Sequence, residues 1–191
     1  PAQCHAAGCA ALRSAPVPGV PLPIPAVLDQ HRPLWSVMIP TYNCARQAAE
    51  TLASVLWQAP EAARMEIVVV DDASDDDIES VVAGFDGRVR FHRQPANLGV
   101  PGNLNAALAL SRGRLVHMLH GDDLVEPGFY AAMEQAFADE QAGAAYCRQI
   151  FIDQDGREMG RSMLAMEQMG RLPDALRFLA TEQRIMTPSI C

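Results

Sequence analysis

Two pairs of aspartates stand just after apolar runs of strand length, and they are the residues of this chain best suited to chemistry. The first pair, Asp71 and Asp72, follows residues 67–70, and the second, Asp122 and Asp123, closes a later run of the same kind. In an open α/β sheet, ligands bind in the crevice outside the carboxyl ends of the strands. We therefore expect both pairs to face one ligand. Carboxylates in this arrangement suit a divalent metal and a nucleotide.

Asp122 and Asp123 are the candidate metal ligands. Mg²⁺ or Mn²⁺ typically takes one or two carboxylates together with the phosphates of a substrate. Two unit charges roughly 4 Å apart interact by about 4 kcal/mol at an effective dielectric of 20, so a bare diphosphate beside these acids is repelled. A bridging cation reverses that sign. His117 and His120 lie nearby, but a histidine at such a place is more often packed or solvated, and we expect neither to bind metal.

The first pair and the turn after the first apolar run supply groups for a nucleoside. Pro40 cannot donate to a sheet ladder, so pairing ends there and Pro40, Thr41, Tyr42 and Asn43 turn out over the crevice. Tyr42 offers a ring face for stacking on a base, and Asn43 is a good helix N-cap. Asp72 can accept the imino N–H of uracil or the hydroxyls of a ribose. Without a ligand, the same residues are a capped βα loop and an acidic loop that caps the next helix.

A Gly- and Asn-rich segment, residues 97–105, leads into a helical pattern. Exposed backbone N–H groups at a helix start can face a diphosphate, and Gly102 and Asn105 are the candidate contacts in this segment. It lacks the spacing of G-x-G-x-x-G, so taken alone a plain turn is the better interpretation.

The elements that must position these residues alternate between strands and helices, as in βαβ units around a parallel sheet. The expected strands are residues 36–39, 66–70, 89–92, 115–119 and 144–150. The expected helices are residues 45–58, one that begins at Ser74, 101–112 with Gly113 as its stop, 128–138 and 172–181, and a hairpin over 151–158 turns on Asp155-Gly156. The fold class is α/β, with a mostly parallel central sheet.

Composition excludes several classes of function. The chain has 191 residues and a formal net charge of -8, which suits one core of ordinary size and disfavours a nucleic-acid partner, because that partner requires clustered cations. All 15 residues counted as Lys or Arg are Arg, and the absence of lysine excludes a Walker-type P-loop and Schiff-base chemistry. Five irregularly spaced cysteines indicate a reducing compartment. No run of residues is apolar enough to span a bilayer.

The domain organisation has two parts. Residues 1–34 are an Ala- and Pro-rich leader or linker, because near-alternating prolines favour extended PPII structure. Residues 35–191 are the folded domain. The chain begins at Pro1 and stops at Cys191, where the pattern is still typical of the middle of a domain, so we expect a piece of a longer polypeptide that is incomplete at its C-terminus.

Four motifs in this order resemble the family 2 glycosyltransferases of GT-A fold, namely residues 37–43, 68–76, 97–105 and 121–123. The resemblance covers residues 35–191 and implies a Rossmann-like α/β/α sandwich. It further implies an enzyme that moves a hexose from a nucleotide-diphosphate sugar, with a UDP-sugar favoured, to a hydroxyl acceptor with inversion. Mg²⁺ or Mn²⁺ as cofactor and a role in cell-surface polysaccharide biosynthesis belong to the same expectation.

The resemblance also assigns roles to residues. Contacts to the base and ribose carry over to Pro40, Tyr42 and Asp72, and Asn105 matches the Asn that follows the family's Gly-containing loop. The family's D-x-D-like motif, which binds the ribose or sugar and the metal on the diphosphate, carries over to Asp122 and Asp123. The resemblance makes Asp123 the better metal ligand of the two.

The chain departs from the family pattern in two respects. His120-Gly121 precedes the second acidic pair where the family more commonly has a small residue and an Asp. The family's general base is usually an acid well downstream of the D-x-D motif. No acid near the end of this chain stands in the expected context, so the catalytic residue is unknown.

Two other classes remain open. One is a catalytically incomplete module that binds a nucleotide sugar. The other is a phosphoacceptor receiver domain, which also gathers Asp residues at strand ends but normally uses a Lys. For the transferase, the acceptor is a glycan, a lipid-linked sugar or a protein. The expected location is cytoplasmic, peripheral to a membrane through regions outside this sequence.

Overall fold

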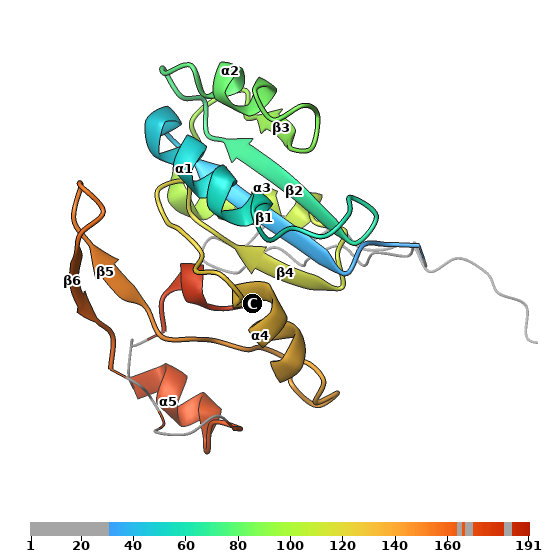
Figure 1. The fold of residues 1–191 in the computed structure, drawn as a ribbon, viewed down its shortest axis with the longest axis vertical. Coiled ribbons are helices and arrows are strands. Elements are labelled where there is room, and N and C mark those ends of the chain that lie inside the picture. Colours follow the sequence, from blue (N-terminus) through green and yellow to red (C-terminus); the bar gives the residue numbers. More distant parts are fainter. Residues whose placement is uncertain (1–30, 164–165, 167–169, 182–184) are drawn as a thin grey trace, which may run out of the picture.

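The structure is a computed structural model that describes residues 31–163, 166, 170–181 and 185–191. Four parallel strands form the central sheet in the order β3-β2-β1-β4 (Figure 1). These strands are β1 (Trp35–Thr41), β2 (Met65–Asp71), β3 (Arg90–Arg93) and β4 (Leu115–Met118). The predicted α/β class with a mostly parallel sheet is confirmed.

Helices cover both faces of the central sheet, and the alternation of side chains along β1 explains how. Trp35, Val37 and Ile39 belong to a core cluster with residues of three helices, whereas Met38 points to the other face and packs with Ala107 of a fourth helix. The helices are α1 (Ala45–Leu56), α2 (Ile78–Ala83), α3 (Gly99–Leu110), α4 (Phe129–Ala136), α5 (Ala175–Thr181) and the 3-10 turn η1 (Thr187–Ser189). With α1, α2 and α4 on one face and α3 on the other, the domain is the expected sandwich.

A two-stranded antiparallel hairpin, β5 (Ile150–Ile152) and β6 (Glu158–Arg161), stands apart from the central sheet (Figure 1). Its turn contains Gly156, whose φ of 78° is the left-handed conformation that glycine adopts without strain. The hairpin predicted from Asp155-Gly156 is therefore confirmed.

The fifth predicted strand, over residues 144–150, is wrong. In its place Tyr146 makes an isolated antiparallel bridge to Ile190, and the backbone N–H and C=O of Ala145 pair with those of Cys191. The partner is a short C-terminal segment rather than a neighbouring strand of the sheet. Only a few residues pair in this way, which is too few to form a regular strand.

Four helices begin at residues other than those predicted, and of these α4 and α5 begin later, at Phe129 rather than Gly128 and at Ala175 rather than Leu172. α2 begins at Ile78 rather than Ser74, because the side chain of Asp77 accepts a hydrogen bond from a backbone N–H of the first turn and acts as the N-cap. α3 begins at Gly99, two residues before Pro101. Proline is tolerated in that first turn, since the N–H groups there have no partner within the helix.

The predicted N-cap role of Asn43 is also wrong. Cys44 occupies the N-cap position of α1, and Asp76 supplies the capping carboxylate from another loop, with its Oδ2 2.7 Å from the backbone N of Ala45. Asn43 has a left-handed φ of 50°, and its Oδ1 accepts a hydrogen bond of 2.8 Å from the backbone N of Asp75. The two loops at the carboxyl end of β1 and β2 are thereby locked together.

Most of the predicted leader, residues 1–30, lies outside the described residues. The carbonyls of Pro33 and Leu34 accept hydrogen bonds from the backbone N of Arg114 (3.1 Å) and Leu115 (2.8 Å), so the chain contacts the entry to β4 just before β1 begins. Among the helices of the described residues, none has both the length and the apolar character needed to cross a membrane.

Gly113 is not the stop of α3, which ends at Leu110 with Ser111 as its C-cap. A Cβ on Gly113 would lie 2.6 Å from the carbonyl carbon of Trp35 and closer still to the backbone N of Ser36. We expect Gly113→Ala to lower the free energy of unfolding by about 2 kcal/mol, because the central strand must shift to admit the methyl group. Urea denaturation measures this.

The matched control for that experiment is Gly143→Ala. A Cβ on Gly143 meets nothing within 4 Å, so this substitution should leave the free energy of unfolding unchanged within about 0.5 kcal/mol. Equal stability of both variants and the wild type would contradict the close approach of Gly113 to β1.

Candidate functional site

Both acidic pairs lie at the carboxyl end of the sheet, one on each side of β1. The carbonyl of Thr41 accepts a hydrogen bond of 2.9 Å from the backbone N of Asp72, and the carbonyl of Pro40 accepts one of 3.1 Å from the backbone N of Gly121. Because β1 lies between β2 and β4, its last residues hold both acidic loops. A pocket of about 420 Å³ opens between them, lined by Pro40, Thr41, Tyr42, Cys44, Asp72, Asn97, Gly99, Val100, Asn103, Leu104, His120, Gly121 and Asp122.

Both aspartates of the first pair are buried, but only Asp72 lines the pocket. Asp71 is 0% exposed, accepts hydrogen bonds from the backbone N (3.1 Å) and the hydroxyl of Ser74, and forms an ion pair of 3.4 Å with Arg93. Asp72 lines the pocket, and its Oδ1 accepts a hydrogen bond of 2.8 Å from the backbone N of Leu98. Within the described part of the chain no donor meets Asp72 Oδ2. Asp72 is therefore the member of the pair that can bind a ligand.

The prediction that pairing ends at Pro40 is wrong, because β1 stays paired with β2 through Pro40 and Thr41. Three of the four residues predicted to form the turn nevertheless line the pocket. Pro40, Thr41 and Tyr42 line it, and the Tyr42 side chain is 51% exposed, so its ring face is accessible for stacking. Asn43 does not line the pocket, because its side chain is occupied by the neighbouring acidic loop. The structure thus gives Asn43 an indirect role, that of holding the two loops together.

The Gly- and Asn-rich segment enters the pocket, but through residues other than those predicted. Gly102 and Asn105 are not among the lining residues, whereas Gly99 and Asn103 are. Asn105 is exposed on α3, and Asn103 is buried. Helical spacing explains the difference, because Asn103 and Ala107 follow Gly99 at intervals of four and so lie on the face toward the sheet. That spacing is visible in the sequence and identifies Asn103.

Asn103 has one satisfied and one free polar atom. Its Nδ2 donates a hydrogen bond of 2.9 Å to the carbonyl of Val70, and its buried Oδ1 has no hydrogen-bond partner among the described residues. The amide therefore fixes α3 to the end of β2.

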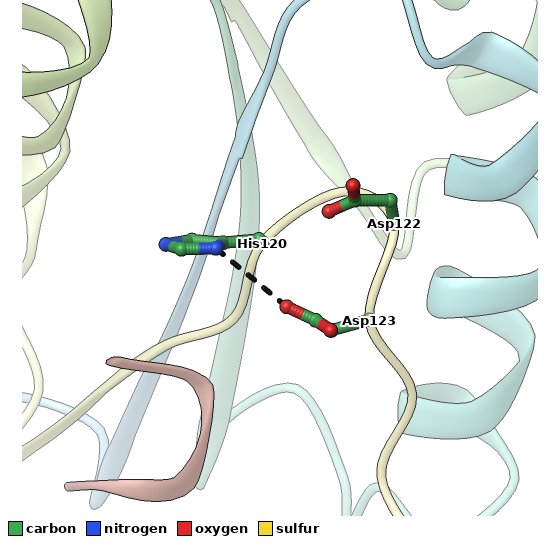
Figure 2. A group of neighbouring side chains, drawn as sticks. All are labelled: His120, Asp122 and Asp123. Atoms are coloured by element: carbon green, nitrogen blue, oxygen red, sulfur yellow. Dashed lines mark ion pairs between the residues drawn. The ribbon is translucent and has the colours of Figure 1, made fainter. Parts of the chain in front are cut away.

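The second acidic pair lies in a tight turn after β4. The backbone N of Asp123 donates a hydrogen bond of 3.1 Å to the carbonyl of His120, and the hydroxyl of Thr51 on α1 donates one of 3.1 Å to the carbonyl of Gly121. A Cβ on Gly121 would lie 2.9 Å from the sulfur of Cys44, so the turn accepts only glycine there without a shift. His120, Asp122 and Asp123 can each bring one ligand atom within 4.8 Å of the others (Figure 2).

The electrostatics of this turn favour a cation. Burial, and then the charge of Asp122, raise the pKa of the Asp123 carboxyl, while His120 acts in the opposite direction. A metal ion beside the Asp123 carboxyl stabilises its ionised form and so opposes both of the effects that raise its pKa. No arginine is among the described residues that line the pocket, so a diphosphate there meets no fixed guanidinium charge. Asp122, Asp123 and His120 are the residues that fit a divalent cation.

The two histidines near the pair have different surroundings. His117 is buried, with Nδ1 3.1 Å from the hydroxyl of Tyr130 and Nε2 3.0 Å from the carbonyl of Pro188, so it is packed as predicted. His120 lines the pocket beside both acids, where a packed or merely solvated residue was expected. Its side chain is partly exposed, and it directly precedes the Gly-Asp-Asp turn.

The fold and the position of the pocket define an open α/β sandwich with a ligand site at the carboxyl edge of a parallel sheet. Comparison with known proteins gives the family. The family model described as Glycosyl transferase family 2 matches residues 36–190, and the chain belongs to this family.

Individual relatives agree with that assignment. The chain is 32% identical over 137 residues to the succinoglycan biosynthesis protein ExoO of Rhizobium meliloti, which is 71% of this chain and 38% of ExoO. A crystal structure of S. aureus TarS in complex with UDP-GlcNAc is similar with a TM-score of 0.57 and 26% identity, over 68% of this chain and 37% of that one. The mannosyltransferase PcManGT of Pyrobaculum calidifontis, in complex with GDP-Man and Mn²⁺, gives a TM-score of 0.55 and 29% identity, over 62% of this chain and 36% of that one. The chain thus spans less than half the length of these relatives.

Membership of this family removes one of the open alternatives. A phosphoacceptor receiver domain is set aside, because the family match covers the strand ends on which that hypothesis rested. The transferase and the non-catalytic module both remain compatible with the family.

Proposed function

We propose that residues 35–191 are the nucleotide-sugar-binding part of a glycosyltransferase that moves a hexose from a nucleotide-diphosphate donor to a hydroxyl acceptor with inversion. One observation carries this proposal. In a chain of Glycosyl transferase family 2, one pocket is lined both by Asp72, an acceptor for a nucleoside, and by residues of a turn that can hold a metal ion. Asp72 matches the nucleoside of a donor, and a cation held by the turn matches the negative charge of its diphosphate.

The nucleoside side of the pocket has defined roles in this proposal. Tyr42 stacks on the base at the open end of the pocket, since its ring is half exposed. Asp72 accepts hydrogen bonds from the base or the ribose through Oδ2, while Oδ1 keeps its bond to Leu98. Pro40 and Thr41 line the same pocket.

The diphosphate side depends on the turn after β4. Asp122 contacts the ribose or the sugar and, with Asp123, holds Mg²⁺ or Mn²⁺. When bound, such an ion neutralises the charge that develops on the leaving diphosphate. The residues of the chain itself position the donor, and the acidic turn binds no diphosphate unless that cation is present.

The donor and acceptor classes are part of the same proposal. A UDP-sugar is the first choice, supported by the TarS complex with UDP-GlcNAc, and GDP-Man is the second, supported by the PcManGT complex. The relation to the succinoglycan biosynthesis protein ExoO supports a role in cell-surface polysaccharide synthesis, with a glycan, lipid-linked or protein acceptor. We place this role in the cytoplasm, peripheral to a membrane.

Calorimetry with UDP-GlcNAc, UDP-glucose and GDP-mannose tests the proposal. We expect at least one donor to bind in the presence of Mn²⁺ or Mg²⁺ with an affinity that falls about tenfold or more in EDTA, because the acids then repel the diphosphate. Asp155→Ala, which removes an exposed carboxylate in the hairpin turn, is the control and should bind the donor as the wild type does. Failure of every donor to bind in a metal-dependent way contradicts the proposal.

Turnover separates the transferase from a module that only binds. Among the described residues, Asp72 and Asp122 are the only carboxylates that line the pocket, and both face the donor in this proposal. Release of free nucleotide from a bound donor supports the transferase. Tight, metal-dependent binding without any release, in the presence of candidate acceptors, supports the module.

A further inference from the structure

Among the described residues, no group makes a hydrogen bond to either ring nitrogen of His120. Its Nδ1 is 3.6 Å from Oδ2 of Asp123, which is beyond hydrogen-bond length, and its Nε2 is buried without a partner among the described residues. A histidine that serves only to pack is normally satisfied at both nitrogens, as His117 is in the same domain. Nδ1 of His120, which faces Asp123, is thus left available to a ligand.

The side chains around His120 are arranged as the ligands of one ion. Figure 2 shows the carboxylates of Asp122 and Asp123 on the side of the turn where the imidazole lies, with one edge of the ring facing Asp123. Two ligand atoms about 2.1 Å from a common ion lie roughly 3 to 4 Å apart. The separation of 3.6 Å between the nitrogen and the Asp123 oxygen falls in that range, and all three ligand atoms lie within 4.8 Å of each other. Small rotations about side-chain bonds bring all three ligand atoms to the distances that one common ion requires.

The backbone holds this arrangement without the ion. The turn is closed by the bond from the backbone N of Asp123 to the carbonyl of His120, and it is attached to β1 and to α1 through Gly121. A site held in this way needs little reorganisation when a cation enters.

A nitrogen ligand changes which ion the site prefers. Mg²⁺ is a hard ion that is bound through oxygen, whereas imidazole binds first-row transition ions well. The usual alternative, an ion pair of His120 with Asp123 at a side chain that is partly exposed, contributes little because solvent screens it.

We propose that His120 is a third metal ligand beside Asp122 and Asp123, and that the site therefore prefers a first-row transition ion such as Mn²⁺ to Mg²⁺. This inference rests on the proposed function, because the ion is the one that accompanies the donor diphosphate. It assigns the choice of metal to one residue of this chain.

Electron paramagnetic resonance of bound Mn²⁺ tests the ligation directly. In the wild-type protein with UDP added, we expect hyperfine coupling from a directly coordinated ¹⁴N nucleus. The coupling should vanish in His120→Asp and remain in His92→Gln, which removes an exposed imidazole from β3. Circular dichroism of each variant shows whether it is folded.

Calorimetric titration of Mn²⁺ and Mg²⁺ in the presence of UDP tests the preference. We expect the wild type to bind Mn²⁺ at least tenfold more tightly than Mg²⁺, and His120→Asp to reduce that ratio by about tenfold, since all three ligands are then oxygens. His92→Gln should keep the wild-type ratio.

The possible results separate this inference from the proposed function. Binding of Mn²⁺ that strengthens UDP affinity without any nitrogen coupling overturns the role of His120 and leaves metal-assisted donor binding standing. A ratio of Mn²⁺ to Mg²⁺ affinity that is the same in His120→Asp overturns the preference. Absence of Mn²⁺ binding with and without UDP overturns both proposals.

Discussion

Replacing Asp72 by asparagine should weaken donor binding by about 10- to 100-fold, both with Mn²⁺ and in EDTA. A hydrogen bond to a charged acceptor contributes roughly 1.5–3 kcal/mol, which corresponds to that range of affinity. Asparagine keeps an oxygen that can accept the bond of 2.8 Å from the backbone N of Leu98. Its amide NH₂ replaces Oδ2, so a donor group now faces the N–H or O–H groups of the nucleoside.

The Asp72→Asn substitution is informative because the fold should survive it. Calorimetry with the preferred donor measures the affinity, and thermal unfolding should show a midpoint close to that of the wild type. Asp75→Asn is the matched control, because it removes the same charge from an exposed side chain in the same loop. If Asp75→Asn weakens binding as strongly as Asp72→Asn, the effect comes from net charge and not from the carboxylate in the pocket.

Asp123→Asn should have a different effect, and the contrast tests the division of work between the acidic pairs. Here the affinity in EDTA does not fall and rises if anything, since one of the acids that repel the diphosphate is gone, and the gain from Mn²⁺ disappears because the substitution acts on the cation and not on the nucleoside. If Asp72→Asn and Asp123→Asn both leave metal-dependent donor binding intact, the assignment of the two pairs is wrong.

The sequence predicted the location of this site because strand ends in a parallel sheet are set by topology. Runs of apolar residues identified β1, β2 and β4, and their carboxyl ends necessarily meet at one edge. The strand pattern alone does not distinguish Asp71 from Asp72, and the choice of Asp72 rests on the family resemblance. In the structure Asp71 is held inside by Ser74 of the following loop and by Arg93 of β3.

The predicted residues that lie elsewhere share a different cause. Asn43 and Asn105 were placed by local chemistry and by motif, whereas their positions follow from tertiary contacts and from helical phase. The carboxylate that caps α1 comes from Asp76, about thirty residues away, and no local pattern indicates such a partner. The surroundings of His120 also depend on tertiary contacts, so the sequence alone does not show that its two ring nitrogens lack hydrogen bonds among the described residues.

The domain should lose up to about 3 kcal/mol of its free energy of unfolding between pH 6.5 and pH 4 because of His117 alone. Burial lowers the pKa of this imidazole from 6.5 to about 4 in the folded protein, against the opposing effect of its bond to Pro188. The unfolded chain takes up a proton below pH 6.5, and the folded protein does so only near pH 4. The stability that the domain gains by keeping His117 neutral is therefore fully present above pH 6.5 and is lost as the pH falls from 6.5 to about 4.

The hydrogen bonds of His117 define its neutral form. The carbonyl of Pro188 can only accept, so Nε2 carries the proton and Nδ1 accepts from the hydroxyl of Tyr130. This one ring thereby joins β4, α4 and η1. Protonation places a charge in a site without a carboxylate partner, and the C-terminal segment that contains Pro188 is the part that we expect to detach first.

Urea denaturation from pH 7.5 to pH 4.5 measures the effect, and His117→Gln isolates it. Glutamine can donate to Pro188 and accept from Tyr130 but does not titrate, so its free energy of unfolding should fall less steeply with decreasing pH than that of the wild type. His92→Gln, which removes an exposed imidazole, should keep the wild-type slope. Carboxylates titrate alike in all three proteins, so the difference in slope belongs to the buried ring. Equal slopes for His117→Gln and the wild type would mean that His117 is already solvated in the folded state, which its complete burial between β4 and η1 does not allow.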